Sequence, residues 1–177
     1  MLKSLDAVTT PDPRYASMSG PSGMFPMTLA DHHEAIAEIM ISPNAPEDVL
    51  RVFGRALNIM LYSWFDYELS PTAELQAFGA LEMALRQRLE KSERVKKRQT
   101  EKGDITLRPL INIAIKEGFL PTELRNHPFL EGIPYLRNIY AHGSASFGGP
   151  AMTLPVLAQC AELINFLYPA PTNSLLG

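Results

Sequence analysis

Apolar residues recur with a helical period along most of the chain, and no segment of useful length alternates between apolar and polar residues as a half-buried strand does. The first helix is expected to begin after Thr28, because Thr28 and Asp31 have the spacing of a capping box. Ile36, Ile39 and Met40 then share one face of that helix. The pattern predicts an all-α fold.

Two longer helices are expected in the middle of the chain. Residues 49–65 have almost no polar side after Arg55, which is typical of a central helix or of one that lies in an interface. Ser70 and Pro71 form an N-cap and first-residue pair for a helix that reaches about Lys91. The buried stripe expected on this helix consists of Leu75, Phe78, Leu81, Leu85 and Leu89.

The second half of the chain continues the helical pattern after an interruption. Residues 92–104 have no apolar stripe and are expected to fray into a mobile loop. A helix follows over residues 105–118, with Pro109 in its first turn and Gly118 at its C-terminal end. Further helical segments are expected at residues 121–126, 129–143 and 154–168.

The chain of 177 residues is long enough for one domain of ordinary size. Residues 1–27 contain four prolines, four methionines and two glycines without a sustained period, and we expect a flexible N-terminal arm that is partly ordered against the body. Residues 28–170 would form the helical domain and residues 171–177 a C-terminal tail. Apolar residues make up 46% of the chain and charged residues 20%, so most of the chain should bury a core.

Composition excludes several classes of protein. Cys160 is the single cysteine, so the chain holds neither an intramolecular disulfide framework nor a CxxC metal or redox site. Asp31, His32 and His33 are expected to be a solvated helix start, because adjacent histidines point about 100° apart on a helix and cannot share a metal. No stretch approaches the roughly 20 apolar residues of a membrane span, and the N-terminus lacks the apolar core of a secretory signal. We therefore expect a soluble, cytoplasmic protein without a membrane, metal or cofactor partner.

Positive charge is concentrated in one segment of an acidic chain. Residues 86–102 carry eight basic and three acidic side chains, whereas the whole chain has a net charge of −3. Such a segment can hold a polyanion such as RNA without the protein being basic as a whole. An ordinary solvated helix end and loop explains the same charges. The candidate substrate-binding residues in this segment are Arg86, Lys96, Lys97 and Arg98.

One group of residues is suited to chemistry, the sequence RNIYAHG at residues 137–143. On a regular helix Asn138 and His142 lie one turn apart on one face, and Arg137 flanks them. His142 directly precedes Gly143, an expected helix end, where the helix dipole favours the imidazolium form. A fixed cation, an amide and a histidine that titrates near neutrality suit phosphodiester chemistry. A structural role, with Arg137 in an ion pair and His142 as a helix cap, fits the same residues.

The spacing of Arg137 and His142, with the polar Asn138 directly after the arginine, resembles the R-x(4–6)-H motif of HEPN domains, which are compact helical bundles. The resemblance extends to residues 78–91, the charged segment after them and residues 154–169. It covers roughly residues 30–169. Many HEPN proteins are metal-independent endoribonucleases of toxin–antitoxin, CRISPR and phage-defence systems. The resemblance implies a HEPN-like antiparallel helical bundle whose active-site residues are Arg137, Asn138 and His142.

The resemblance also implies a role for each residue of the motif. Arg137 would bind the scissile phosphate, His142 would act as acid and base, and Asn138 would orient the histidine or the phosphate. Candidates for positions around this site are Glu82, Tyr140 and Ser144. An ordinary surface role explains Glu82 as well. One toxin branch has a tyrosine where this chain has Ser144, so regulation by nucleotide modification of that tyrosine is not expected here.

Cleavage of RNA by its own 2′-hydroxyl needs a proton acceptor, a proton donor and stabilisation of the charge on the phosphate. One arginine and one histidine supply these functions incompletely, so we expect a homodimer with both 137–143 segments near the twofold axis. The apolar run 57–65 also exceeds what one small bundle needs. The leading hypothesis is a metal-independent endoribonuclease that acts on RNA, with an antitoxin or defence-system protein as a partner. The alternatives are a non-catalytic HEPN module that binds nucleotide, RNA or protein, and a helical protein unrelated to RNA.

Overall fold

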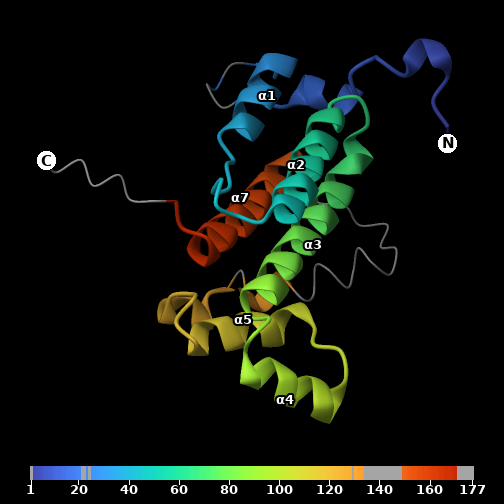
Figure 1. Cartoon of the computed structure of the whole chain (residues 1–177). Coiled ribbons are helices and arrows are strands. Elements are labelled where there is room, and N and C mark those ends of the chain that lie inside the picture. Colours follow the sequence, from blue (N-terminus) through green and yellow to red (C-terminus); the bar gives the residue numbers. More distant parts are fainter. Residues whose placement is uncertain (1, 21–22, 24, 129, 134–148, 171–177) are drawn as a thin grey trace, which may run out of the picture.

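All regular structure in the computed structural model is helical within the residues it describes, which are 2–20, 23, 25–128, 130–133 and 149–170 (Figure 1). The α-helices with defined bounds are α1 (Leu29–Ala37), α2 (Glu47–Tyr62), α3 (Ser70–Arg88), α4 (Glu93–Lys102), α5 (Leu107–Lys116) and α7 (Pro150–Leu167), and residues 128 and 130–133 are α-helical as well. The shorter 3-10 helices are η1 (Leu5–Ala7), η2 (Pro13–Ser17), η3 (Tyr67–Leu69) and η4 (Thr122–Asn126). The predicted all-α class is confirmed.

Helices α2, α3 and α7 pack together at the centre of the molecule (Figure 1). A short connection joins α2 to α3, and these two helices run antiparallel. Helix α7 instead runs in the same direction as α3. Thr153 near the start of α7 donates a hydrogen bond to Glu74 near the start of α3, and Tyr168 just beyond α7 donates one to the carbonyl oxygen of Ala84 near the end of α3. The expected antiparallel arrangement therefore holds for α2 and α3, whereas α3 and α7 are parallel.

The apolar stripe predicted on the long central helix is buried at four of its five positions. Phe78, Leu81, Leu85 and Leu89 are buried, whereas Leu75 is partly exposed. Four alanines of α3 are buried as well, and their small side chains let neighbouring helices pack close to its backbone. These alanines are Ala73, Ala77, Ala80 and Ala84. The predicted stripe therefore includes only part of the surface of α3 that is buried against other helices.

Several local signals at helix ends are confirmed. The Thr28 hydroxyl accepts a hydrogen bond from the Asp31 amide at 3.2 Å, and the Asp31 carboxylate accepts one from the Thr28 amide at 2.8 Å, which completes the predicted capping box. Pro109 is the third residue of α5, where its missing N–H costs no helical hydrogen bond. Gly118 follows α5 with a φ of 77°, the left-handed conformation that glycine provides at a helix end.

The long central helix begins one residue before the predicted start and ends about three residues before the predicted end. Ser70 is not the N-cap, because η3 runs directly into α3 and Ser70 is the first residue of that helix. The Ser70 hydroxyl donates a hydrogen bond to the carbonyl oxygen of Tyr67 at 2.9 Å instead of capping the helix. At the other end α3 stops at Arg88, short of Lys91.

The loop predicted after α3 is also wrong, because residues 93–102 form α4. Ser92 caps this helix, since its hydroxyl oxygen accepts a hydrogen bond from the Val95 amide at 3.3 Å and donates one to Glu117 at 2.5 Å. Val95 is the one buried side chain among those described on α4. A good N-cap and a single apolar anchor therefore form a helix that has no apolar stripe.

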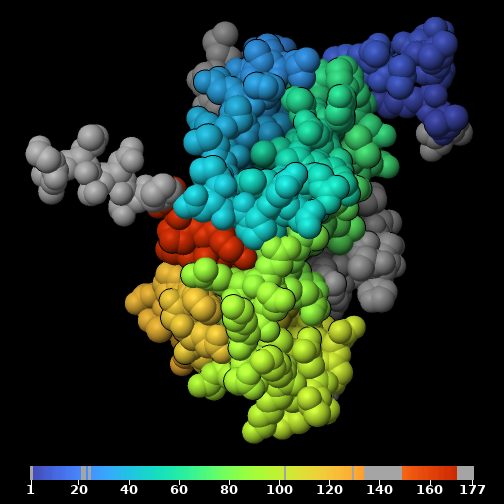
Figure 2. All heavy atoms as spheres, viewed as in Figure 1, coloured from blue at the N-terminus to red at the C-terminus, as the bar shows by residue number. Residues whose placement is uncertain are grey.

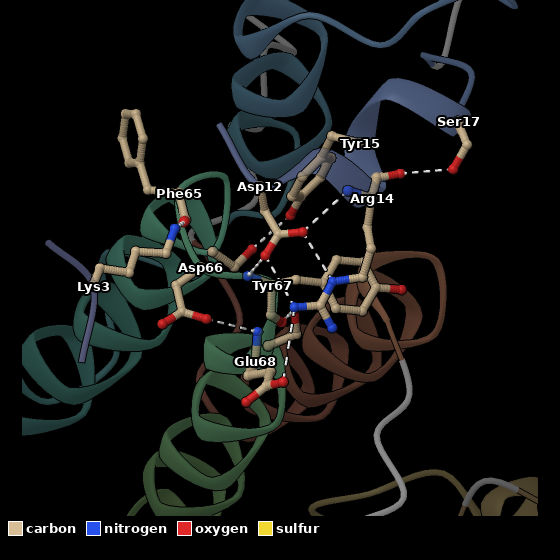
Figure 3. A network of polar contacts seen from close by, with 11 residues as sticks. Lys3, Asp12, Arg14, Tyr15, Ser17, Phe65, Asp66, Tyr67 and Glu68 are labelled. Carbon is tan, nitrogen blue, oxygen red and sulfur yellow. Dashed lines mark hydrogen bonds and ion pairs between the residues drawn. The ribbon is translucent and has the colours of Figure 1, made fainter. Parts of the chain in front are cut away.

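The middle of the N-terminal arm contacts the helical body, in keeping with an arm that is partly ordered against it (Figure 3). The Asp12 carboxylate accepts hydrogen bonds from the Arg14 side chain at 2.9 and 3.0 Å and from the Tyr67 amide at 3.2 Å. The hydrogen bond from the Arg14 side chain lowers the pKa of Asp12 to about 2. Tyr15 is buried, and its hydroxyl lies 2.9 Å from Ser63 Oγ. These contacts attach the arm to the turn between α2 and α3.

Contrary to the expectation from the sequence, helix α7 is long and apolar enough to cross a membrane by length and composition, and no other helix in the described part of the chain is. Half of it is buried inside the bundle, where it packs against α3 and α2. The central helix of a helical bundle meets the same criteria of length and composition. The packing of α7 is that of a core helix.

Candidate functional site

Five of the predicted site residues fall within residues 134–148, outside the described part of the chain: Arg137, Asn138, Tyr140, His142 and Ser144. Their roles stay predictions. Among the described residues, the candidates for a functional role are the polar side chains of α3, the start of α7 and the basic helix α4.

Glu82 and Arg86 form an ion pair one turn apart on α3. The Arg86 guanidinium donates hydrogen bonds to Glu82 Oε1 at 3.1 and 2.8 Å, and another to the carbonyl oxygen of Ile105 at 2.7 Å. Arg86 thereby ties α3 to the chain that enters α5. Arg86, one of the predicted RNA-binding residues, therefore already has partners within the protein. Glu82, which was predicted to lie around the active site, is more buried than an ordinary surface glutamate.

Helix α4 presents the other predicted RNA-binding residues to solvent at one end of the molecule, seen in yellow-green in Figures 1 and 2. Lys96, Lys97 and Arg98 are all exposed. Lys96 lies 2.7 Å from Glu93, and Lys97 lies 3.9 Å from Glu101, so both ion pairs are internal to the helix. Exposed pairs of this kind contribute little to stability, and a phosphate can replace the carboxylate at small cost.

Glu74 was not among the predicted residues, although it is a buried carboxylate where α3 meets α7. Thr153 Oγ1 donates a hydrogen bond to Glu74 Oε1 at 2.6 Å. A buried carboxylate is costly unless it is hydrogen-bonded, so this contact fixes the start of α7 against α3. The available signal was its position, because Glu74 lies four residues before Phe78 and shares the buried side of the helix.

Cys160 is an inert buried thiol, as predicted. It lies in α7 and is fully buried. Burial, with a smaller contribution from the charge of Glu74, raises the pKa of the Cys160 thiol far above its usual value. Because the thiolate is the nucleophilic form, nucleophilic chemistry near neutral pH is excluded at this position.

A second contact holds the start of α7, between Tyr67 and Gly149. A Cβ atom added to Gly149 would lie 1.4 Å from the Tyr67 hydroxyl oxygen and 2.3 Å from its Cζ atom, so any other residue would force the Tyr67 side chain to move. The Arg14 guanidinium lies over the Tyr67 ring, 4.4 Å from its centroid (Figure 3). Gly149 follows His142 by seven residues in the sequence.

His32 does not belong to a solvated helix start, contrary to the prediction. It is buried, its Nε2 atom lies 2.9 Å from the carbonyl oxygen of Met60, and its ring packs against Tyr15 and Trp64. Burial lowers the pKa of His32. The next residue, His33, is exposed. The two histidines do not share a site, and no group of three side chains suited to binding a metal occurs among the described residues.

No protein-family model matches this chain, and no curated protein or solved structure is significantly similar to it. Functional conclusions therefore rest on the residues and contacts of the chain itself.

Proposed function

We propose that this protein is a HEPN-like, metal-independent endoribonuclease that works as a homodimer in the cytoplasm. The observation that carries this conclusion is the sequence of residues 137–143, in which an arginine and an asparagine stand about one helical turn before a histidine and a glycine. The all-α architecture around a long central helix supports it, because the HEPN domains that the sequence resembles are helical bundles. We also propose a role in a toxin–antitoxin pair or in phage defence, with the corresponding partner protein.

In the proposed reaction the 2′-hydroxyl of one nucleotide attacks the adjacent phosphorus. His142 of one copy accepts the hydroxyl proton, and His142 of the partner subunit donates a proton to the 5′-oxygen as its bond to phosphorus breaks. Arg137 stabilises the charge on the phosphate oxygens, and Asn138 orients the histidine or the phosphate. The products are a 2′,3′-cyclic phosphate and a 5′-hydroxyl, and the two histidines together neither gain nor lose a proton.

RNA beyond the scissile bond would contact α4. Lys96, Lys97 and Arg98 are exposed there, and their positive charges suit the phosphate backbone. Arg86 contributes less, because its guanidinium already binds Glu82 and the chain before α5. The affinity for RNA should therefore fall as the salt concentration rises. It should depend more on the basic residues of α4 than on Arg86 of α3.

Incubation of the purified protein with total RNA in EDTA tests this function. Wild type should cleave RNA and leave 2′,3′-cyclic phosphate ends, whereas His142→Ala should lose at least about 100-fold in rate. His127→Ala is the matched control, because His127 is exposed and lies outside the motif. Dependence on Mg²⁺, efficient cutting of DNA or an unchanged rate in His142→Ala would contradict the function. RNA binding without cleavage would identify a non-catalytic HEPN module instead.

A further inference from the structure

The tip of the N-terminal arm exposes apolar side chains. Leu2 is 97% exposed and Leu5 is 88% exposed, and Val8 is half exposed. Lys3 Nζ donates a hydrogen bond to the carbonyl oxygen of Phe65 just after α2, which ties the tip to the molecule while the leucines stay in solvent (Figure 3). The tip, in the darkest blue, projects from the body of the molecule in Figures 1 and 2.

Two adjoining apolar hollows lie beside the tip. The first, of about 480 Å³, is lined by Leu29, Ala30, His33, Leu61, Tyr62 and Phe65, from the start of α1 and the end of α2. The second, of about 490 Å³, shares Tyr62 and Phe65, and Leu2 and Val8 form part of its other wall. Tyr62 is 60% exposed, so the wall between the hollows is open to solvent.

The tip and the hollows have complementary chemistry. The tip presents aliphatic side chains, and the first hollow has aliphatic and aromatic walls. Both hollows have room for a leucine side chain, since a cavity of about 150 Å³ already accommodates benzene. The six residues that line the first hollow include no carboxylate, lysine or arginine, and the second hollow adds one charge of each sign, Lys3 and Asp66, so neither hollow carries a net charge that would repel a second copy.

We infer that residues 2–8 of one copy of this chain dock into the hollows of a second copy, and the reverse, around a twofold axis. The chain carries both sides of the contact, and a twofold arrangement forms both contacts at once and closes the assembly. A continuous exposed apolar surface over two elements marks an interaction site, whereas single exposed leucines do not. Docking of this kind deepens the homodimer part of the proposed function and rests on it, but it does not depend on the nuclease chemistry.

Sedimentation velocity at micromolar concentration tests the contact. Wild type should sediment as a dimer, and Leu5→Asp and Tyr62→Asp should each shift most of the protein to the monomer. Both side chains are mostly exposed, so the helix content measured by circular dichroism should not change. Met40→Asp is the matched control, because Met40 is 74% exposed outside these two hollows, and it should remain a dimer. A monomeric wild type, or a dimer that survives both substitutions, would overturn the docking.

Introduced cysteines show whether the tip reaches a second chain. Cys160 is buried, so it should not interfere. A chain with Leu5→Cys and a differently tagged chain with Ala30→Cys should form a disulfide between the two tags under mild oxidation, whereas Leu5→Cys with Met40→Cys should not. Absence of the first disulfide would overturn the docking. So would a monomer that binds phosphatidylcholine vesicles, because the leucines would then serve a membrane.

RNA cleavage in EDTA, measured on the same samples, separates this docking from the nuclease activity. If both aspartate variants remain dimers and cleave RNA, the docking is contradicted and the nuclease activity is supported. If wild type is a dimer that each substitution converts to a monomer, but it never cleaves RNA, the nuclease activity is contradicted and the docking is supported. Cleavage by a monomeric wild type would remove the docking and the homodimer together.

Discussion

The polar side chains at the two ends of α3 differ in burial. Near its start, Glu74 is buried and bound to Thr153 of α7. Toward its end, Glu82 and Arg86 pair with each other in partial contact with solvent, and the next helix, α4, carries exposed charges. A buried polar group that loses its partner has no water to replace it, whereas an exposed pair exchanges one solvated partner for another. The start of α3 should therefore determine stability, and the region after its end should be free to bind a ligand.

Glu74→Ala should be the most damaging single change. It removes the acceptor of the Thr153 hydroxyl and leaves a cavity between α3 and α7, so the free energy of unfolding measured in urea should fall by about 2–4 kcal/mol. Glu74→Gln keeps an acceptor oxygen at nearly the same volume and should cost less. A smaller loss for Glu74→Ala than for Arg86→Ala would reverse the contrast between the two ends.

Gly149→Ala should have the next largest effect, because it drives a methyl group into the Tyr67 hydroxyl. Overpacking of this kind costs about 1–3 kcal/mol, which thermal unfolding would detect. Tyr67→Ala in the same chain removes the obstacle, so the double variant should lose less stability than the two single losses added together. Strictly additive losses would show that Tyr67 does not hold the start of α7.

Acid should weaken the same buried region through His32. Burial places the pKa of His32 in the folded protein below its usual value of 6.5, so below pH 6.5 the unfolded chain binds a proton that the folded protein does not. Stability is therefore fully present above pH 6.5 and falls as the pH drops below it. The fluorescence of Trp64, the single tryptophan, reports this loss because its ring packs against His32.

The exposed His127 provides the control for this pH dependence, since His127→Ala should leave it unchanged. Asp12 has its pKa lowered from 3.8 to about 2, so it should add a separate loss of stability only as the pH falls from 3.8 toward 2. A urea midpoint that stays flat or rises between pH 6.5 and pH 5 would contradict the role of the buried histidine.

The triple change of Lys96, Lys97 and Arg98 to alanine should have the smallest effect on stability, because these side chains are exposed. RNA affinity should fall, and the slope of its logarithm against the logarithm of salt concentration should become shallower by about 2. Arg51→Ala is the control, an exposed arginine on α2 that should change neither quantity. A large loss of stability, or an unchanged salt slope, would remove α4 from RNA binding.

Features whose partners lie close in sequence could be predicted from the sequence. Thr28 and Asp31 are three residues apart, and Gly118 ends its own helix, so local rules were enough. Helix α4 was not predicted because its sequence has no periodic apolar stripe. Its stability depends instead on the Ser92 cap and on the contact of Ser92 with Glu117, which lies 25 residues away.

The candidate site divides in the same way. The spacing of Arg137 and His142 is visible in the sequence because the motif is local. The position of Glu74 on the buried side of α3 is visible in the same way, but its hydrogen bond with Thr153 is not, because Thr153 lies 79 residues away. His32 was misjudged for a related reason, since Tyr15 and Met60 cover it and lie 17 and 28 residues away in the sequence.

A ribonuclease site shared by two copies is tested most directly by combining two inactive variants. Chains with His142→Ala and chains with Arg137→Ala, carrying different tags, would be co-expressed, purified as heterodimers and incubated with RNA in EDTA. Each homodimer should be inactive. The heterodimer keeps one histidine and one arginine at the shared site, so it should cleave more slowly than wild type but faster than either homodimer, which lacks one of the two residue types altogether, and it should leave 2′,3′-cyclic phosphate ends. Demonstrated heterodimers that cleave no RNA would contradict a shared site.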